Sequence, residues 1–248
     1  MVQDLPLTGE RTMPGIPYEN YWFRRHEAAY QHVARLVAGR TVLDVGCGEG
    51  YGTAMLSDNT RTALGIDYDA AIIRHAAATY SDAAFAMANL AALPVRDQTI
   101  DAVMTLQVIE HVWDPDQFLH ECYRVLWPSG RLIITTPNRL TFSPGLDEPA
   151  NPYHTREFSS AELRTLVPDN GFMLLEVAGV HARPRVQDLD RKHDGFVNAQ
   201  LAAPPENWST ALRADVASIR AADFTVMVAA DRDVDACLDL VLTACRPT

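Results

Sequence analysis

Features that mark secreted, membrane-spanning and metal-stabilised proteins are largely missing from this sequence of 248 residues. It has only four cysteines, and their spacing fits neither a disulfide framework nor a metal site: Cys47, Cys122, Cys237 and Cys245. No apolar run reaches the roughly 18 residues of a membrane-spanning helix. No basic segment followed by an apolar one opens the chain, so we expect no signal peptide. These absences predict a cytoplasmic protein with reduced thiols.

Positive charge is also scarce. Lysine and arginine number 21 against 32 aspartates and glutamates, which gives a formal net charge of −11. Nucleic-acid binding needs a basic face that neutralises phosphates, and adsorption to anionic membranes needs one too. We therefore expect a small-molecule acceptor, and neither nucleic acid nor a membrane, among the partners. Hydrophobic residues make up 48% of the chain, which is enough for one substantial core.

Short apolar segments alternate with amphipathic ones along the chain. The expected strands are 41–45, 63–67, 85–89, 100–106, 131–136, 172–177 and 238–244. The expected helices are 20–37, 115–126, 160–167 and 208–222. Such alternation predicts an α/β fold in which helices cover both faces of a mostly parallel, seven-stranded sheet. We expect one Rossmann-like domain made of an N-terminal cap segment and helix (1–39), a cofactor-binding core (40–182), a helical insertion (183–235) and a final strand (236–248).

A glycine-rich turn follows the first expected strand. Its glycines at 46, 48 and 50 let the backbone pass close beneath a ligand. A dinucleotide-binding turn would need its third glycine at position 51, where the bulky Tyr51 stands. The acidic Asp44 before the turn suits a cationic ligand group and would repel a pyrophosphate. Asp67, at the end of the second strand, is placed to accept hydrogen bonds from two ribose hydroxyls.

The segment Leu43–Gly50 resembles the first motif of the class I S-adenosylmethionine-dependent methyltransferases. Further segments fit that family in order, namely Ala88–Pro94, Asp101–Val103 with Gln107–His111, and Arg124–Gly130. The last of these carries Ser129 where the family usually has glycine. The resemblance covers about residues 40 to 180 and implies a methyltransferase that uses S-adenosyl-L-methionine as its cofactor.

The resemblance also implies roles for individual residues. Those implied to contact the cofactor are, from its methionine part through the ribose to the adenine, Asp44, Gly46, Gly48, Asp67, Asn89 and Leu90. Gln107 is implied to lie beneath the sulfonium, with its backbone carbonyl or its side chain facing the methyl donor. Tyr68 either covers the adenine or packs on the surface.

Methyl transfer is an in-line displacement, and alignment of acceptor, methyl carbon and sulfur supplies much of the catalysis. A hydroxyl acceptor is a poor nucleophile until its proton leaves, so O-methylation favours a general base with a near-neutral pKa. His154 lies in the long connection after the fifth strand, at the edge of the sheet where ligands bind. We expect His154 to be this base and Tyr153 to contact the acceptor. The alternative is that His154 caps a turn after Asn151 and Pro152.

Glu110 and His111 directly follow the fourth strand. We expect His111 to contact the acceptor or to orient this exit loop. These two residues and His154 could converge on a divalent ion, although their spacing along the chain is not typical of metal ligands. A sugar hydroxyl could share Mg²⁺ with such carboxylates, so Mg²⁺ stays an open alternative.

The N-terminal segment is dense in aromatic and charged side chains. In the resembled family an N-terminal helix lies over the cofactor and shapes the acceptor cleft. Glu19, Tyr21 and Trp22 suit sugar recognition, because aromatic rings stack on sugar faces and charged groups bond to hydroxyls. Tyr21 and Arg25 could instead bind the cofactor carboxylate. The alternative is a docked helix whose charges face solvent.

Three segments, 8–12, 21–27 and 138–145, resemble one group within the family. These are actinobacterial O-methyltransferases of two polysaccharides, the methylmannose polysaccharide and the methylglucose lipopolysaccharide. This resemblance implies transfer to a sugar hydroxyl, the 1-OH of a methylated mannose oligosaccharide. Two rival hypotheses are an O-methyltransferase for a phenolic or quinone-type acceptor and a cofactor-binding protein without turnover. The insertion 183–235 could form a homodimer contact or an acceptor lid.

Overall fold

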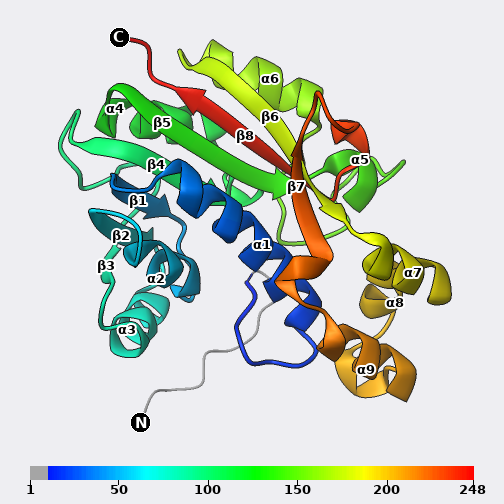
Figure 1. Ribbon diagram of the computed structural model, residues 1–248. Helices are drawn as coiled ribbons and strands as arrows, with labels where there is room; N and C mark the ends of the chain where they lie inside the picture. Colours follow the sequence, from blue (N-terminus) through cyan, green and yellow to red (C-terminus); the bar gives the residue numbers. More distant parts are fainter. Residues whose placement is uncertain (1–10) are drawn as a thin grey trace.

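The computed structural model describes residues 11–248, which contain one sheet of eight strands in the order β3-β2-β1-β4-β5-β8-β6-β7 (Figure 1). The strands are β1 (Thr41–Val45), β2 (Thr62–Asp67), β3 (Ala84–Met87), β4 (Ile100–Leu106), β5 (Leu126–Pro137), β6 (Met173–Ala182), β7 (Phe224–Val228) and β8 (Asp239–Cys245). Strands β1 to β5 pair in parallel, whereas β8 is antiparallel to both β5 and β6. All strands except β7 and β8 therefore run in one direction, which confirms the mostly parallel α/β fold.

Helices flank both faces of this sheet. They are α1 (Asn20–Leu36), α2 (Tyr51–Ser57), α3 (Ala70–Thr79), α4 (Pro115–Val125), α5 (Arg139–Phe142), α6 (Ser160–Asp169), α7 (Pro184–Lys192), α8 (Phe196–Leu201) and α9 (Thr210–Ser218). None of the helices within residues 11–248 has the length and apolar character needed to cross a lipid bilayer.

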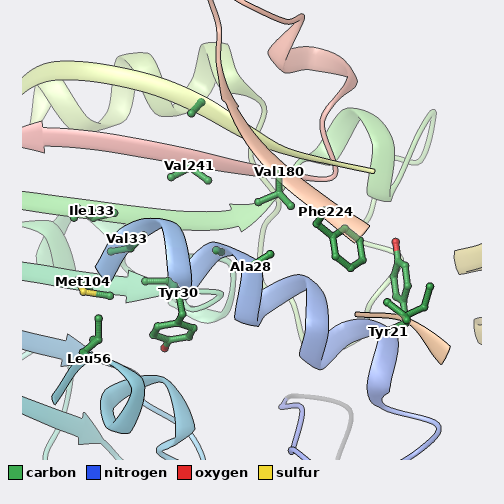
Figure 2. Close-up of a cluster of buried hydrophobic side chains, with 14 of the residues drawn as sticks. Tyr21, Ala28, Tyr30, Val33, Leu56, Met104, Ile133, Val180, Phe224 and Val241 are labelled. Atoms are coloured by element: carbon green, nitrogen blue, oxygen red, sulfur yellow. The ribbon is translucent and has the colours of Figure 1, made fainter. Parts of the chain in front are cut away.

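The sheet has one strand more than the sequence predicted. The extra strand is β7, which pairs antiparallel with β6 at the edge of the sheet. The prediction assigned all of 183–235 to a helical insertion and was wrong here, although α7, α8 and α9 do lie in that segment. Phe224 of β7 packs edge-on against Tyr21 of α1, as Figure 2 shows. Residues 224–228 nevertheless form an apolar, β-branched run of the kind that predicts a strand, and the prediction overlooked it.

Two hydrophobic clusters lie on opposite faces of the sheet. The first joins strand residues such as Val42, Met104 and Val241 to helices α1, α2 and α7–α9. Figure 2 shows Met104 and Val241 together with side chains of α1 and α2. The second joins Leu43 and Val103 to helices α4 and α6. Successive residues of a strand point to opposite faces, so Val42 and Leu43 enter different clusters. Because helices cover both faces of the sheet, a ligand is expected at the ends of the strands.

The carboxyl ends of β1, β2, β4 and β5 meet at the same edge, because these strands are parallel neighbours. The turn before α2 follows β1, and a short 3-10 turn, Ile109–His111, follows β4. The chain from β5 passes through α5 and a long loop before α6. Of the predicted site residues, these three connections hold Gly46, Gly48, Gln107, His111, Tyr153 and His154. The others lie at the ends of β1, β2 and β3 or at and within α1.

Candidate active site

Three glycines shape the turn between β1 and α2. Gly46, Gly48 and Gly50 all have positive φ, of 79°, 52° and 99°. A Cβ at Gly46 would lie 2.4 Å from a methyl carbon of Val108, so the approach of these two loops requires glycine there. The backbone N–H of Gly48 donates to the Asp67 carboxylate over 3.1 Å, which joins the ends of β1 and β2. The turn thus leaves its backbone, without side chains, next to the carboxylate of Asp67.

Asp44 is fully buried beneath this turn. Its carboxylate accepts a hydrogen bond from the Thr53 hydroxyl at 2.7 Å and a longer one from Tyr30 at 3.4 Å. Burial raises the pKa of Asp44 to about 6, although these hydrogen bonds oppose the shift. A cation above the turn would favour the ionised carboxylate. Asp44 is not among the residues that line the pocket described next, so a ligand there could be affected by its charge and would not touch its side chain.

The larger of two adjoining pockets lies along this edge of the sheet and has a volume of about 690 Å³. That volume suits a small-molecule cofactor. Its wall contains most of the predicted cofactor contacts, namely Gly46, Gly48, Asp67, Tyr68, Asn89, Leu90 and Gln107. His26, Tyr51 and Trp113 line it as well, and none of them was predicted to contact the cofactor. The structure therefore gathers residues from four separate connections around one cavity.

A smaller pocket of about 310 Å³ adjoins the larger one. The two share Gln107, His111, Tyr153 and His154 as lining residues. The smaller pocket alone is lined by aromatic, apolar and charged side chains that include Glu19, Trp22, Arg25, Phe142 and Leu201. A ligand in the smaller pocket would therefore meet one in the larger pocket beside Gln107 and His154.

His154 is held by two neighbours in its own loop. Its Nδ1 lies 2.8 Å from a carboxylate oxygen of Glu157, and its Nε2 lies 3.1 Å from the side-chain nitrogen of Asn151. A carboxylate accepts and an amide nitrogen donates, so this arrangement assigns the ring proton to Nδ1 and a lone pair to Nε2. The side chains of His154 and Glu157 are only 4% and 1% exposed. Glu157 was missed from the sequence, where its only signal is a spacing of three residues from the histidine.

Glu110 and His111 reach the same place from the exit loop of β4. The backbone carbonyl of Glu110 accepts a hydrogen bond from the Thr155 N–H at 2.7 Å, which ties this loop to the loop of His154. One oxygen of the Glu110 carboxyl accepts from the Thr136 hydroxyl at 2.9 Å, and the other is buried without a hydrogen-bond partner. Burial raises the pKa of Glu110 to about 8. The structure thus brings Glu110 and His111 next to His154, the three residues that were expected to be able to converge.

Gln107 adopts a left-handed backbone conformation, with φ of 58°, at the end of β4. Its side-chain nitrogen donates to the Thr135 hydroxyl and to the buried Asp239 carboxylate, both over 3.3 Å. These bonds use the donors of the amide and leave its oxygen as an acceptor for a ligand. Gln107 lines both pockets, as expected for a residue between donor and acceptor.

The comparisons with known proteins identify the family. Residues 43–134 match the family described as "Methyltransferase domain". The chain is 49% identical over 246 residues to a probable S-adenosylmethionine-dependent methyltransferase of Mycolicibacterium smegmatis, an alignment that covers 98% of this chain and 96% of that relative. The chain belongs to the S-adenosylmethionine-dependent methyltransferases. S-adenosyl-L-methionine is accordingly the cofactor of this methyltransferase.

More distant proteins share parts of its sequence or its fold. The methyltransferase is 27% identical over 175 residues to the ubiquinone biosynthesis O-methyltransferase of Coxiella burnetii, covering 64% of this chain and 75% of that protein. A solved S-adenosylmethionine-dependent methyltransferase from Thermotoga maritima superposes with a TM-score of 0.64 at 18% identity, over 91% of this chain and 92% of that one. The latter similarity confirms the Rossmann-like methyltransferase fold and goes no further.

Two predicted contacts of α1 differ from expectation. Tyr21 is 1% exposed, packs against Phe196 and Phe224 in the core, and is not among the residues that line either pocket. Arg25 lines the smaller pocket, where its guanidinium pairs with the buried Asp239 and donates to a backbone carbonyl at 2.8 Å. The guanidinium of Arg25 was expected to bind the cofactor carboxylate, but it is already paired with the carboxylate of Asp239.

The remaining N-terminal contacts are closer to expectation. Glu19, Trp22 and Tyr153 line the smaller pocket. Residues 8–10 of the predicted recognition segment lie outside the described part of the chain, whereas Arg11 and Thr12 line both pockets. The start of the described chain and α1 therefore both contribute side chains to the wall of the site.

Proposed function

We propose that this methyltransferase transfers the methyl group of S-adenosyl-L-methionine to a sugar hydroxyl, the 1-OH of a methylated mannose oligosaccharide. The observation that carries the proposal is His154, which lines both pockets and directs its Nδ1 proton to the buried Glu157. An imidazole held in this tautomer is suited to remove a proton with Nε2. A hydroxyl acceptor needs such a base far more than a neutral amine does, because its oxygen becomes a good nucleophile only as its proton leaves.

In this proposal the cofactor lies in the larger pocket. The residues assigned to it, from adenine through ribose to methionine, are Leu90, Asn89, Tyr68, Asp67, Gly48 and Gly46. The ionised Asp44 favours the cationic amino group from beneath the glycine turn. Gln107 places its amide oxygen beside the sulfonium, at the junction with the smaller pocket. The methyl group then points toward the acceptor.

The transfer is a single displacement. The acceptor hydroxyl gives its proton to Nε2 of His154 as its oxygen forms a bond to the methyl carbon. S-adenosyl-L-methionine would supply the methyl group and leave as S-adenosylhomocysteine, with the electron pair of the broken carbon–sulfur bond on sulfur. Asn151 must release Nε2 for this step, since its amide donates there in the structure. The Glu157 carboxylate stabilises the imidazolium that forms.

The smaller pocket has the mixed lining that a methylated sugar would need. Trp22 and Phe142 lie edge to face with ring centroids 6.2 Å apart and offer apolar contact for a ring face or a methoxy group. Glu19 and Tyr153 offer polar groups for hydroxyls. His111 donates from Nδ1 to the Tyr153 carbonyl over 2.9 Å, so its contact with the acceptor would be made by the rest of its ring.

The decisive experiment measures methyl transfer to mannose and methylmannose oligosaccharides with a radiolabelled methyl donor. His154→Ala should lower kcat by about 10²–10⁴-fold, the usual contribution of a general base, while the affinity for S-adenosylhomocysteine is retained. The exposed His120 on α4 supplies the matched control, and His120→Ala should keep full activity. A His154→Ala enzyme with near-normal turnover would remove the base from the mechanism.

A second acceptor class is favoured by one feature of the smaller pocket. Trp22, Phe142 and Leu201 would also accommodate a phenolic or quinone-type ring. The similar protein from Coxiella burnetii is named a ubiquinone biosynthesis O-methyltransferase. A phenolic hydroxyl ionises more easily than a sugar hydroxyl, so phenol methylation should depend less on His154. Activity on phenols with none on mannose or glucose oligosaccharides would replace the sugar proposal. Activity on glucose oligosaccharides alone would shift it to the methylglucose lipopolysaccharide.

A further inference from the structure

Three side chains with metal-binding chemistry meet where the two pockets join. One potential ligand atom from each of Glu110, His111 and His154 lies within 4.8 Å of the other two. The residues come from two loops that are held together by the backbone hydrogen bond between Glu110 and Thr155. The fold therefore holds the two loops of the cluster together, beside the junction of the two pockets.

Both histidines are oriented as metal-bound histidines usually are. His154 bonds through Nδ1 to the Glu157 carboxylate at 2.8 Å, and His111 bonds through Nδ1 to the Tyr153 carbonyl at 2.9 Å. A metal-ligating imidazole almost always donates its other N–H to a carboxylate or a backbone carbonyl, which fixes the tautomer. Each ring therefore has its lone pair on Nε2, the atom that a metal would take.

Glu110 supplies the third donor and the independent observation. Its residue is 1% exposed, and one carboxyl oxygen is buried without any hydrogen-bond partner. Buried polar atoms are rarely left unpaired, and an unpaired one requires an explanation such as an ion that completes the site. The other oxygen is fixed by Thr136, so the carboxyl group cannot turn away without losing that bond.

We propose that Glu110, His111 and His154 bind a divalent transition-metal ion. Two imidazole nitrogens and one carboxylate oxygen form the donor set of zinc sites and of related sites for manganese, iron and cobalt. Mg²⁺ prefers oxygen ligands and keeps several waters, so this donor set disagrees with the earlier Mg²⁺ alternative. Tetrahedral ligands at roughly 2.1 Å from Zn²⁺ are about 3.4 Å apart, so the three side chains close by a small rotation when the ion binds.

The ion has a consequence for catalysis that rests on the proposed function. His154 offers one lone pair at Nε2, which serves either as a metal ligand or as the base that takes the acceptor proton. Ion binding also displaces the Asn151 amide from that nitrogen. The ion-bound enzyme therefore lacks its base, and transfer should slow as the site fills.

The test separates binding from turnover. The whole protein, stripped with a chelator and free of cofactor and acceptor, is titrated with Co²⁺, Zn²⁺ and Mg²⁺ by calorimetry and, for Co²⁺, by visible absorption. We expect one ion per chain and affinities for Zn²⁺ and Co²⁺ at least about 100-fold above that for Mg²⁺. Glu110→Gln and His111→Ala should each weaken Co²⁺ binding by about 10-fold or more, whereas His120→Ala should not change it.

The outcomes distinguish this proposal from the proposed function. Absence of Co²⁺ and Zn²⁺ binding, or binding that survives in both ligand variants, would overturn the metal site and leave methyl transfer untouched. Co²⁺ binding with the expected loss in the variants, together with a fall in turnover, would support both. If the ion binds at these residues and turnover rises, the metal site stands and the base role of His154 fails. Circular dichroism of each variant confirms that lost binding does not reflect lost folding.

Discussion

Burial of the ionised carboxylate of Asp44 lowers the free energy of unfolding of the ligand-free protein. Its pKa rises to about 6 from an ordinary value of 3.8, so between these values the folded state holds a proton that the unfolded state has released. This contribution to stability therefore falls as pH rises from about 4 to about 6 and is level above that, with a total cost of about 3 kcal/mol. A charge held at this cost beneath the pocket favours a cationic methyl donor.

Replacement of Asp44 by Asn should remove the cost. The amide oxygen can still accept the hydrogen bond from Thr53, and no charge is buried. The parent protein should lose up to about 3 kcal/mol of unfolding free energy relative to Asp44→Asn when the pH is raised from 4 to 7. The variant is favoured at pH 7 because it buries no charge. Urea denaturation at the two pH values measures it. The same difference at both would show that burial of Asp44 does not cause the dependence.

At the scale of elements, helix α6 begins directly after the loop that holds His154 and Glu157. Ser159 caps it, with its hydroxyl accepting from the Glu162 N–H while the Glu162 carboxylate accepts from the Ser159 N–H at 2.8 Å. Ser159→Ala should lower the free energy of unfolding by about 1 kcal/mol, because the first turn of the helix loses its cap. Ser159→Thr, which keeps a hydroxyl, is the control. Equal denaturation midpoints for all three proteins would contradict the importance of this cap.

Elements with local signals could be predicted from the sequence, and those without could not. Strands β1 and β4 occupy the predicted residues 41–45 and 100–106, because apolar runs and flanking turns define them. Strand β6 continues to Ala182, beyond the predicted end at 177, because β7 and β8 pair with its second half. Strand β7 is the exception: Phe224–Val228 is an apolar, β-branched run, but the prediction assigned the whole of 183–235 to a helical insertion.

The same limit applies to the site. Gly46, Asp67 and Asn89 could be placed because each occupies a fixed position after a strand. Glu157 acquires its role only when its loop folds onto Glu110, and Arg25 is paired with Asp239, which lies 214 residues away in the sequence. Electrostatic partners of that kind depend on the assembled sheet, so a sequence pattern cannot indicate them.

At the scale of the whole molecule, a ligand of the larger pocket should raise the free energy of unfolding. The pocket is built from connections that come together only in the folded protein, so the ligand binds the folded state and not the unfolded chain. S-adenosylhomocysteine at 100 times its Kd should stabilise the fold by about 2.7 kcal/mol. For a chain of this size that corresponds to a rise in Tm of about 5–11 °C.

NAD⁺ supplies the control, because Tyr51 occupies the position where a pyrophosphate-binding turn needs glycine and Asp44 repels phosphate. Stabilisation by NAD⁺ equal to that by S-adenosylhomocysteine would contradict the selectivity attributed to this turn. Stabilisation by S-adenosylhomocysteine alone would support a turn that accepts an amino group and excludes a pyrophosphate.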